Sequence, residues 1–117
     1  ESAARQLAAA DLPAAQNLLG ILLRRTNPEE SLAMFKHAAS HGMARAMAEV
    51  GLMLSNGDGA PRDLTEAAAW LKKSAEAGST EGMILYAECL LGGKGVPVDE
   101  PAAAALYTQA AALGSLP

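Results

Sequence analysis

The stretch that decides the fold is Gly57–Gly78, which reads GDGAPRDLTEAAAWLKKSAEAG. A second version of it, GKGVPVDEPAAAALYTQAAALG, occupies Gly93–Gly114, 36 residues further along the chain. Each version opens with a G-x-G-x-P-x-D loop and continues as an Ala-rich segment of equal length. A fixed period in this range predicts a solenoid, in which each repeat buries its apolar face only by stacking on its neighbours.

The composition indicates an all-α domain. The chain has 117 residues, of which 50% are hydrophobic and only 3% are aromatic. The apolar residues are largely Ala and Leu, which favour helices, and β-branched residues are scarce. The net charge of −4 argues against the basic stripe of a nucleic-acid-binding protein, and no apolar run is long enough to span a membrane.

Capping residues predict where the helices begin. Asp11 and Pro13 start a helix that runs to about Arg24, with Leu18, Leu19, Leu22 and Leu23 as its apolar face. Asn27, Pro28 and Glu30 resemble a capping box at the start of a helix that Gly42 ends. Further helices are expected at 43–56, from Asp63 to residue 77, at 79–91 and at 99–113. The first repeat lacks the G-x-G loop of the later ones.

We therefore predict one domain over residues 1–117. Residues 1–11 are read as the trailing helix of a preceding repeat, and three repeats follow at 12–42, 43–78 and 79–114. Ala3, Leu7 and the last helix are expected to make contacts with other chains, because the ends of a repeat array expose apolar faces.

Residues of all three repeats resemble the Sel1-like repeat pattern of L-G-x-x-Y, G-x-G-V-x-x-D and A-x-x-W-Y-x-K-A-A-x-x-G. In the middle repeat these include Gly51, Gly57, Asp63, Trp70 and Gly78. The resemblance implies a TPR-like α-solenoid of antiparallel helix pairs with a right-handed superhelix. It also implies a non-catalytic scaffold or adaptor that binds proteins. The large residues Met34, Trp70 and Leu106 are expected to fill the gaps between neighbouring pairs.

No residue pattern indicates catalysis or a cofactor. His37 and His41 have metal-ligand spacing, but without a third ligand nearby they are interpreted as surface residues. Cys89 is interpreted as a structural thiol and the five Met residues as core filler, with Met43 and Met53 partly exposed. The glycine loops lack the strand and the Walker arrangement of a phosphate site. We predict no metal, no cofactor, no nucleic acid and no direct membrane insertion.

The remaining candidate is the concave side, where the first helix of each pair should present a stripe of exposed residues. The expected stripe contains Ile21, Leu52, Ile84 and Leu91 as an apolar line, together with Ala14, Ala48 and Ser55. Basic residues lie towards one end and acidic residues towards the other. The predicted protein-binding residues are Asn17, Ile21, Arg24, Arg25, Arg45, Leu52, Asn56, Glu81, Ile84 and Glu88.

The sequence thus favours a protein or peptide partner of unknown identity, bound on the concave face. Two alternatives stay open: a structural spacer without its own ligand, and an enzyme-like relative that interacts with β-lactams. The exposed ends of the array suggest self-association. Nothing in the residues points to a compartment, and the resemblance alone favours the bacterial cell envelope or periplasm over the cytoplasm.

Overall fold

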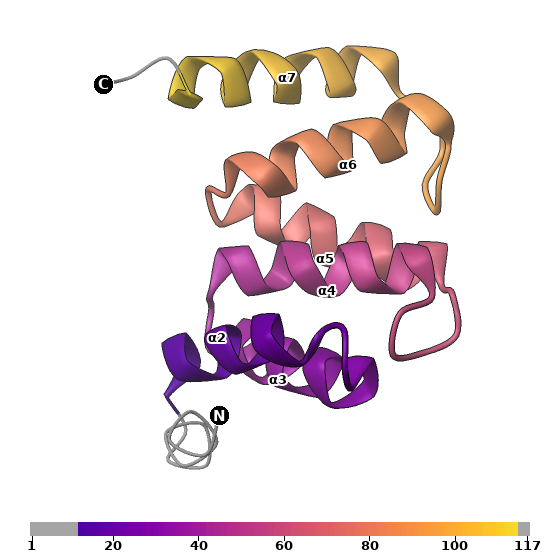
Figure 1. Cartoon of the computed structure of the whole chain (residues 1–117). Coiled ribbons are helices and arrows are strands. Elements are labelled where there is room, and N and C mark those ends of the chain that lie inside the picture. Colours follow the sequence, from indigo (N-terminus) through magenta and orange to yellow (C-terminus); the bar gives the residue numbers. More distant parts are fainter. Residues whose placement is uncertain (1–11, 115–117) are drawn as a thin grey trace.

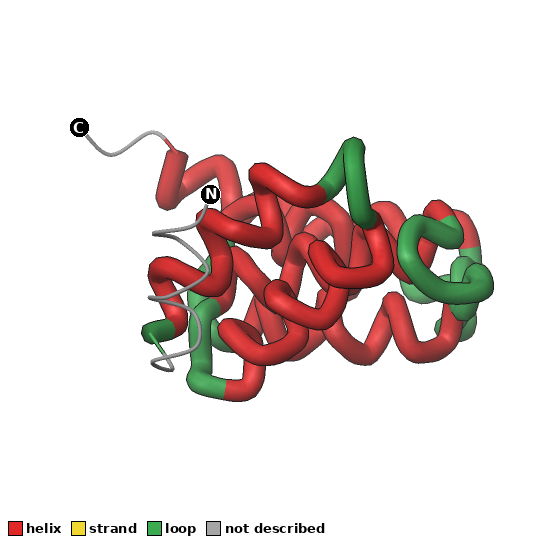
Figure 2. Tube along the Cα trace, turned by 60° about the horizontal axis from the view of Figure 1, so that its bottom comes forward, coloured by secondary structure: helices red, strands yellow, loops and turns green. Residues whose placement is uncertain are grey.

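A computed structural model describes residues 12–114, which form six α-helices and no strand. The helices are α2 (Pro13–Leu23), α3 (Pro28–Ser40), α4 (Ala44–Asn56), α5 (Leu64–Glu76), α6 (Thr80–Gly92) and α7 (Glu100–Gly114). They stack one after another along the molecule (Figure 1), and the loops gather at the helix ends (Figure 2). The predicted all-α solenoid of helix pairs is confirmed. The trailing helix expected at 1–11, with Ala3 and Leu7, lies outside the described residues.

Three helix pairs build the stack. The first helices α2, α4 and α6 pack against the second helices α3, α5 and α7, respectively. Successive pairs are joined through contacts of α3 with α4 and of α5 with α6, and the first helices α4 and α6 also contact each other. The middle pair, α4 with α5, is therefore covered by a neighbouring pair on both sides, as the interior of a solenoid requires.

The predicted capping residues set most of the helix starts. The side chains of Asn27 and Asp63 accept hydrogen bonds from the backbone N–H of Glu30 (3.2 Å) and Glu66 (3.0 Å). The Asn27 side-chain amide also donates to the Glu30 carboxylate at 3.0 Å, a side-chain contact that differs from the backbone N–H bond of a capping box. The start of α2 differs from the prediction, because its N-cap is Leu12, which offers no side-chain acceptor.

Within a pair, a small residue on the first helix receives a large one from the second. A Cβ atom on Gly20 would lie 2.9 Å from the Phe35 ring, and one on Gly51 would lie 2.6 Å from Leu71 Cγ. Both distances are too short for real carbon contacts, so these mid-helix glycines are required by the close approach of the partner side chain. In the third pair Ala87 takes the same position and belongs to a cluster against which Tyr107 packs.

The G-x-G loops are fixed by a contact between repeats. Gly59 has φ +79°, and a Cβ atom there would lie 2.9 Å from the carbonyl carbon of Pro28, at the start of α3. Gly95 has φ +77°, and its Cβ atom would collide in the same way with the carbonyl group of Leu64, at the start of α5. The second glycine of each loop thus packs directly on the backbone of the preceding second helix.

Two predictions about burial are wrong. Leu19 and Leu23 are buried, but Leu18 and Leu22 are 53% and 54% exposed. The reason is that α2 packs through the single stripe of Gln16, Leu19, Gly20 and Leu23, and its other apolar residues lie outside that stripe. Met53, expected to be partly exposed, is fully buried in the cluster that joins α3, α4 and α5.

Candidate protein-binding surface

The exposed side of the first helices carries the predicted binding residues. All ten are at least partly exposed: Asn17, Ile21, Arg24, Arg25, Arg45, Leu52, Asn56, Glu81, Ile84 and Glu88. Ala48, expected on the same stripe, has no exposed surface. The stripe on α4 therefore follows Arg45, Glu49, Leu52 and Asn56, a spacing of four, three and four residues that keeps them on one helix face.

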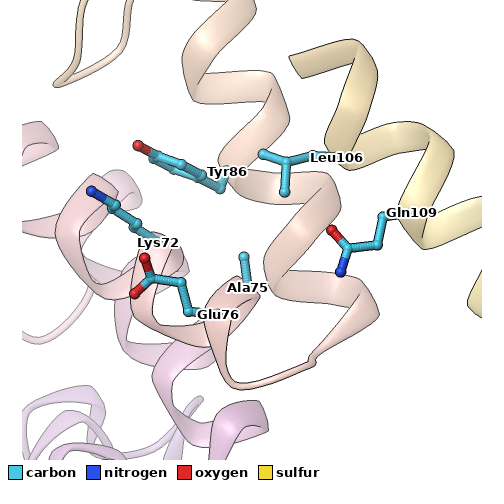
Figure 3. A pocket seen from close by; sticks show the side chains of 6 residues that line it. All are labelled: Lys72, Ala75, Glu76, Tyr86, Leu106 and Gln109. Atoms are coloured by element: carbon cyan, nitrogen blue, oxygen red, sulfur yellow. The ribbon is translucent and has the colours of Figure 1, made fainter. Parts of the chain in front are cut away.

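Two of the hollows in the described part of the chain lie between helices of neighbouring pairs. The first, which we call the α5–α7 hollow, lies among the second helices and has a volume of about 340 Å³ (Figure 3). It is lined by Lys72, Ala75, Glu76, Tyr86, Leu106 and Gln109. None of these residues belongs to the predicted binding surface.

The second hollow, which we call the α4–α6 pocket, does belong to that surface. Its volume is about 200 Å³, and its polar residues include Asn56 and Glu88. The complete lining is Leu52, Ser55, Asn56, Leu71, Leu85, Glu88, Cys89 and Lys94. Three leucines and a thiol beside an amide, a carboxylate and an ammonium group form the mixed lining that is typical of a pocket for an apolar side chain with a polar neighbour.

Cys89 contributes to the wall of this pocket but not as a nucleophile. The thiol is 6% exposed and packs with Ala68 and Leu71. Burial raises the pKa of the Cys89 thiol, the charge of Glu88 raises it further, and Lys94 opposes the change. A buried thiol with a raised pKa stays protonated near neutral pH, so the interpretation of Cys89 as a structural residue agrees with its surroundings.

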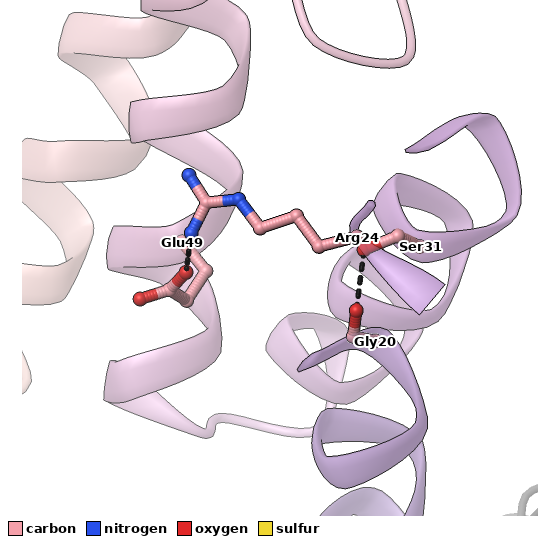
Figure 4. A network of polar contacts seen from close by, with 4 residues as sticks. All are labelled: Gly20, Arg24, Ser31 and Glu49. Carbon is pink, nitrogen blue, oxygen red and sulfur yellow. Dashed lines mark hydrogen bonds and ion pairs between the residues drawn. The ribbon is translucent and has the colours of Figure 1, made fainter. Parts of the chain in front are cut away.

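A polar cluster around Glu49 occupies the same side of the stack. Arg24 of α2 donates to Glu49 of α4 across a 3.1 Å ion pair, in which the Glu49 side chain is only 12% exposed (Figure 4). Where α2 faces α3, the Ser31 hydroxyl donates a hydrogen bond to the backbone carbonyl of Gly20 at 2.6 Å. This bond connects α3 to α2. The negative charge of Glu81 on α6 also acts on the Glu49 carboxyl and raises its pKa, while the charge of Arg45 lowers it.

Glu49 lies on the candidate surface but was not among the residues predicted from the sequence. It pairs with Arg24, and the charges of Arg45 and Glu81, which were expected towards opposite ends of a charge gradient, both act on its pKa. A signal for it was present, because Glu49 follows Arg45 by four residues and precedes Leu52 by three. No described contact joins Ile21, Arg25 or Ile84 to this cluster.

The cluster makes stability depend on pH in a defined direction. Burial, and then the charge of Glu81, raises the pKa of Glu49 above its ordinary value of 4.5, while Arg24 and Arg45 oppose the rise. Between 4.5 and the raised value, the folded chain holds a proton that the unfolded chain has lost, so the contribution of Glu49 to the free energy of unfolding falls as pH rises.

We therefore expect Glu49→Gln, which stays neutral, to gain stability relative to the wild type as pH rises through that interval. Urea unfolding at a series of pH values from about 4 to 8 measures the difference. Glu76→Gln, an exposed substitution on α5, serves as the control. A difference between wild type and Glu49→Gln that does not change with pH would contradict this account of the cluster.

The other sequence candidates do not form sites. His41 Nδ1 lies 2.9 Å from the backbone oxygen of His37, and the Gln16 amide lies 2.9 Å from His37 Nδ1. Within residues 12–114, no three metal-ligating side chains come together. In the same range, no helix combines the length and apolar character needed to cross a bilayer.

Comparison with known proteins identifies the repeat. The model of the Sel1 repeat family matches residues 13–43, 44–79 and 80–115, so the resemblance drawn from the sequence is confirmed. No curated protein matches the sequence.

Solved structures agree with the family match. A protective antigen of uropathogenic Escherichia coli, c5321, aligns with 96% of the chain at 26% identity and a TM-score of 0.91. A Sel1 repeat protein from Oxalobacter formigenes aligns with 92% at 28% identity and a TM-score of 0.85. Cysteine-rich protein B of Helicobacter pylori shares the fold over 76% of the chain, at 24% identity and a TM-score of 0.72. The chain spans 25% of the first of these proteins and 46% of the second.

Proposed function

Because the chain belongs to the Sel1 repeat family, whose members are typically protein-interaction scaffolds, we propose that its first helices bind an extended segment of a partner protein. The observation that carries this proposal is the α4–α6 pocket. Three of the predicted binding residues, Leu52, Asn56 and Glu88, line one hollow between two neighbouring first helices. Sel1 repeats generally form non-catalytic helical scaffolds, and the pocket offers binding groups rather than an activated nucleophile.

The lining suggests what the segment contains. Leu52, Leu71 and Leu85 offer an apolar floor for one aliphatic side chain. At the rim, the Asn56 amide can both donate to and accept from a peptide backbone, as strands and extended segments require. The branched side chains of the three leucines favour a branched aliphatic anchor such as Leu or Ile.

The charges favour a basic residue beside that anchor. The helix α6 carries Glu81 and Glu88 on its exposed side and contains no Lys or Arg, and the single basic residue of the pocket lining is Lys94. Arg24, which follows the last residue of α2, is already paired with Glu49, so its positive charge is partly neutralised. A Lys or Arg two to four residues from the anchor would meet the two α6 carboxylates, which sets orientation and association rate more than total affinity.

Selection from a displayed random peptide library tests the proposal. We expect enriched peptides to share an aliphatic residue close to a Lys or Arg. The substitution Leu52→Glu should weaken their binding by about tenfold or more, since it places a charge in the apolar anchor site. Leu18→Glu is the matched control, because Leu18 is an equally apolar residue that is 53% exposed on α2, outside the pocket.

A second readout locates the bound peptide. Residues 52, 56, 85 and 88 line the pocket, so their amide NMR signals should shift when the peptide binds. Equal binding by the wild type and Leu52→Glu, or shifts confined to other residues, would overturn the assignment to this pocket. A library that yields no specific peptide would favour the alternative of a spacer without a ligand.

A further inference from the structure

The α5–α7 hollow lies between two repeats, on the side of the second helices. Lys72, Ala75 and Glu76 come from α5, Tyr86 from α6, and Leu106 and Gln109 from α7 (Figure 3). Its volume of about 340 Å³ lies at the lower end of the range for small-molecule sites. The equivalent position one repeat earlier, between α3 and α5, is occupied by side chains of the protein itself.

At the junction of α3 with α5, the corresponding space is filled by an indole ring and a carboxylate. Trp70 packs against the core cluster that contains Ala39 and Val50, the residues that stand 36 positions before Ala75 and Tyr86. The indole N–H of Trp70 donates to the Glu66 carboxylate at 3.2 Å. That carboxylate in turn lies 3.6 Å from the Lys36 ammonium group of α3. The Trp70 ring, the Glu66 carboxylate and the Lys36 ammonium group are therefore linked by successive polar contacts.

The junction of α5 with α7 has a lysine at the equivalent position, but it has neither the carboxylate nor the indole ring. Lys72 stands 36 positions after Lys36, whereas the positions of Glu66 and Trp70 are taken by Ala102 and Leu106. No described carboxylate lies within ion-pair distance of Lys72, and Leu106 is smaller than the indole that it replaces. The hollow therefore lies where the repeat period would place a ring and a negative charge.

We propose that the α5–α7 hollow binds an aromatic carboxylate, with the ring against Leu106, Ala75 and Tyr86 and the carboxylate against Lys72. The Tyr86 ring and the Leu106 side chain supply flat and apolar contacts for the ligand ring. Gln109 adds an amide at the rim, where the preceding repeat has Lys73 over the Trp70 ring. Glu76 also lines the hollow, one turn of α5 after Lys72, so its negative charge reduces the attraction of Lys72 for the ligand carboxylate (Figure 3).

Titration with N-acetyl-tryptophan, followed by amide NMR shifts of the whole chain, tests the site. We expect saturable shifts at residues of α5, α6 and α7 around the hollow. N-acetyl-tryptophanamide, which has the same ring without the charge, should bind about threefold more weakly. A short peptide that ends in Trp distinguishes the two sources of this chemistry: tighter binding indicates a protein C-terminus, and weaker binding indicates a free aromatic acid.

Variants separate the site from non-specific binding. Lys72→Gln should weaken N-acetyl-tryptophan binding about threefold, and its repeat equivalent Lys36→Gln should leave binding unchanged. Leu106→Trp, which restores the ring, should abolish the saturable shifts. If Leu106→Trp disturbs the fold, Ala102→Glu provides the second variant, because its carboxylate would pair with Lys72 and compete with the ligand. The proposal is overturned if no saturable shift appears at millimolar ligand, if the shifts lie around Leu52 and Cys89 instead, or if Lys72→Gln and Lys36→Gln behave alike.

Discussion

Gly59→Ala is expected to lower the free energy of unfolding by about 3 kcal/mol or more, a large effect for the addition of one methyl group. Two costs combine at this position. The backbone adopts φ +79°, which residues with a Cβ atom reach only at a cost of about 1–2 kcal/mol. The new Cβ atom would also meet the backbone of Pro28 and Glu29, which cannot move without disturbing the capped start of α3.

The matched control is Gly78→Ala. Gly78 has φ +96°, also in the left-handed region, but a Cβ atom there has no neighbour within 4 Å. Gly78→Ala should therefore lower the free energy of unfolding only by the conformational cost of positive φ, about 1–2 kcal/mol. Urea unfolding followed by circular dichroism measures both variants. Equal losses for Gly59→Ala and Gly78→Ala would show that the contact of the loop with α3 does not contribute to stability.

This pair of glycines also shows how far the sequence can be interpreted. The G-x-G loops predict left-handed turns and a repeat period, because few residues other than glycine adopt positive φ. They do not reveal that the second glycine lies against the preceding second helix, since that contact joins residues about 30 positions apart, such as Gly59 and Pro28. The helix starts at Asn27 and Asp63 were predictable because capping is a local interaction within four residues.

Burial was harder to predict where a helix is apolar on several sides. In α2, leucines occur at 18, 19, 22 and 23, and their spacing cannot decide which pair faces α3. The structure selects Leu19 and Leu23, because Gly20 between them admits the Phe35 ring. The position of Glu49 is a similar case: Ala48 is fully buried, so the exposed stripe of α4 runs through Glu49 in its place.

The same helix pair provides the second large expected effect. Phe35→Ala should lower the free energy of unfolding by about 4 kcal/mol, the range for removal of a buried aromatic ring. Phe35 has no exposed surface, fits against Gly20 of α2, and belongs to the cluster that joins α3 to Val50 and Met53 of α4. One ring therefore supports both the first pair and its junction with the second, and its loss leaves a cavity between three helices.

Phe35→Leu is the informative comparison, because Leu71 performs the same task against Gly51 in the second repeat. A leucine should restore most of the packing and cost about 1.5 kcal/mol. Hydrogen exchange of α2 and α3, measured alongside urea unfolding, should show faster opening of the first pair in Phe35→Ala than in Phe35→Leu. If both variants lose the same stability, the fit of the Phe35 ring against Gly20 does not stabilise the pair of α2 and α3. The stabilisation by Phe35 must then come from its contacts between α3 and α4. If instead only Phe35→Ala loses protection in α2, the first pair depends on this ring for its place in the stack, since each repeat is held mainly by the interface with its neighbours.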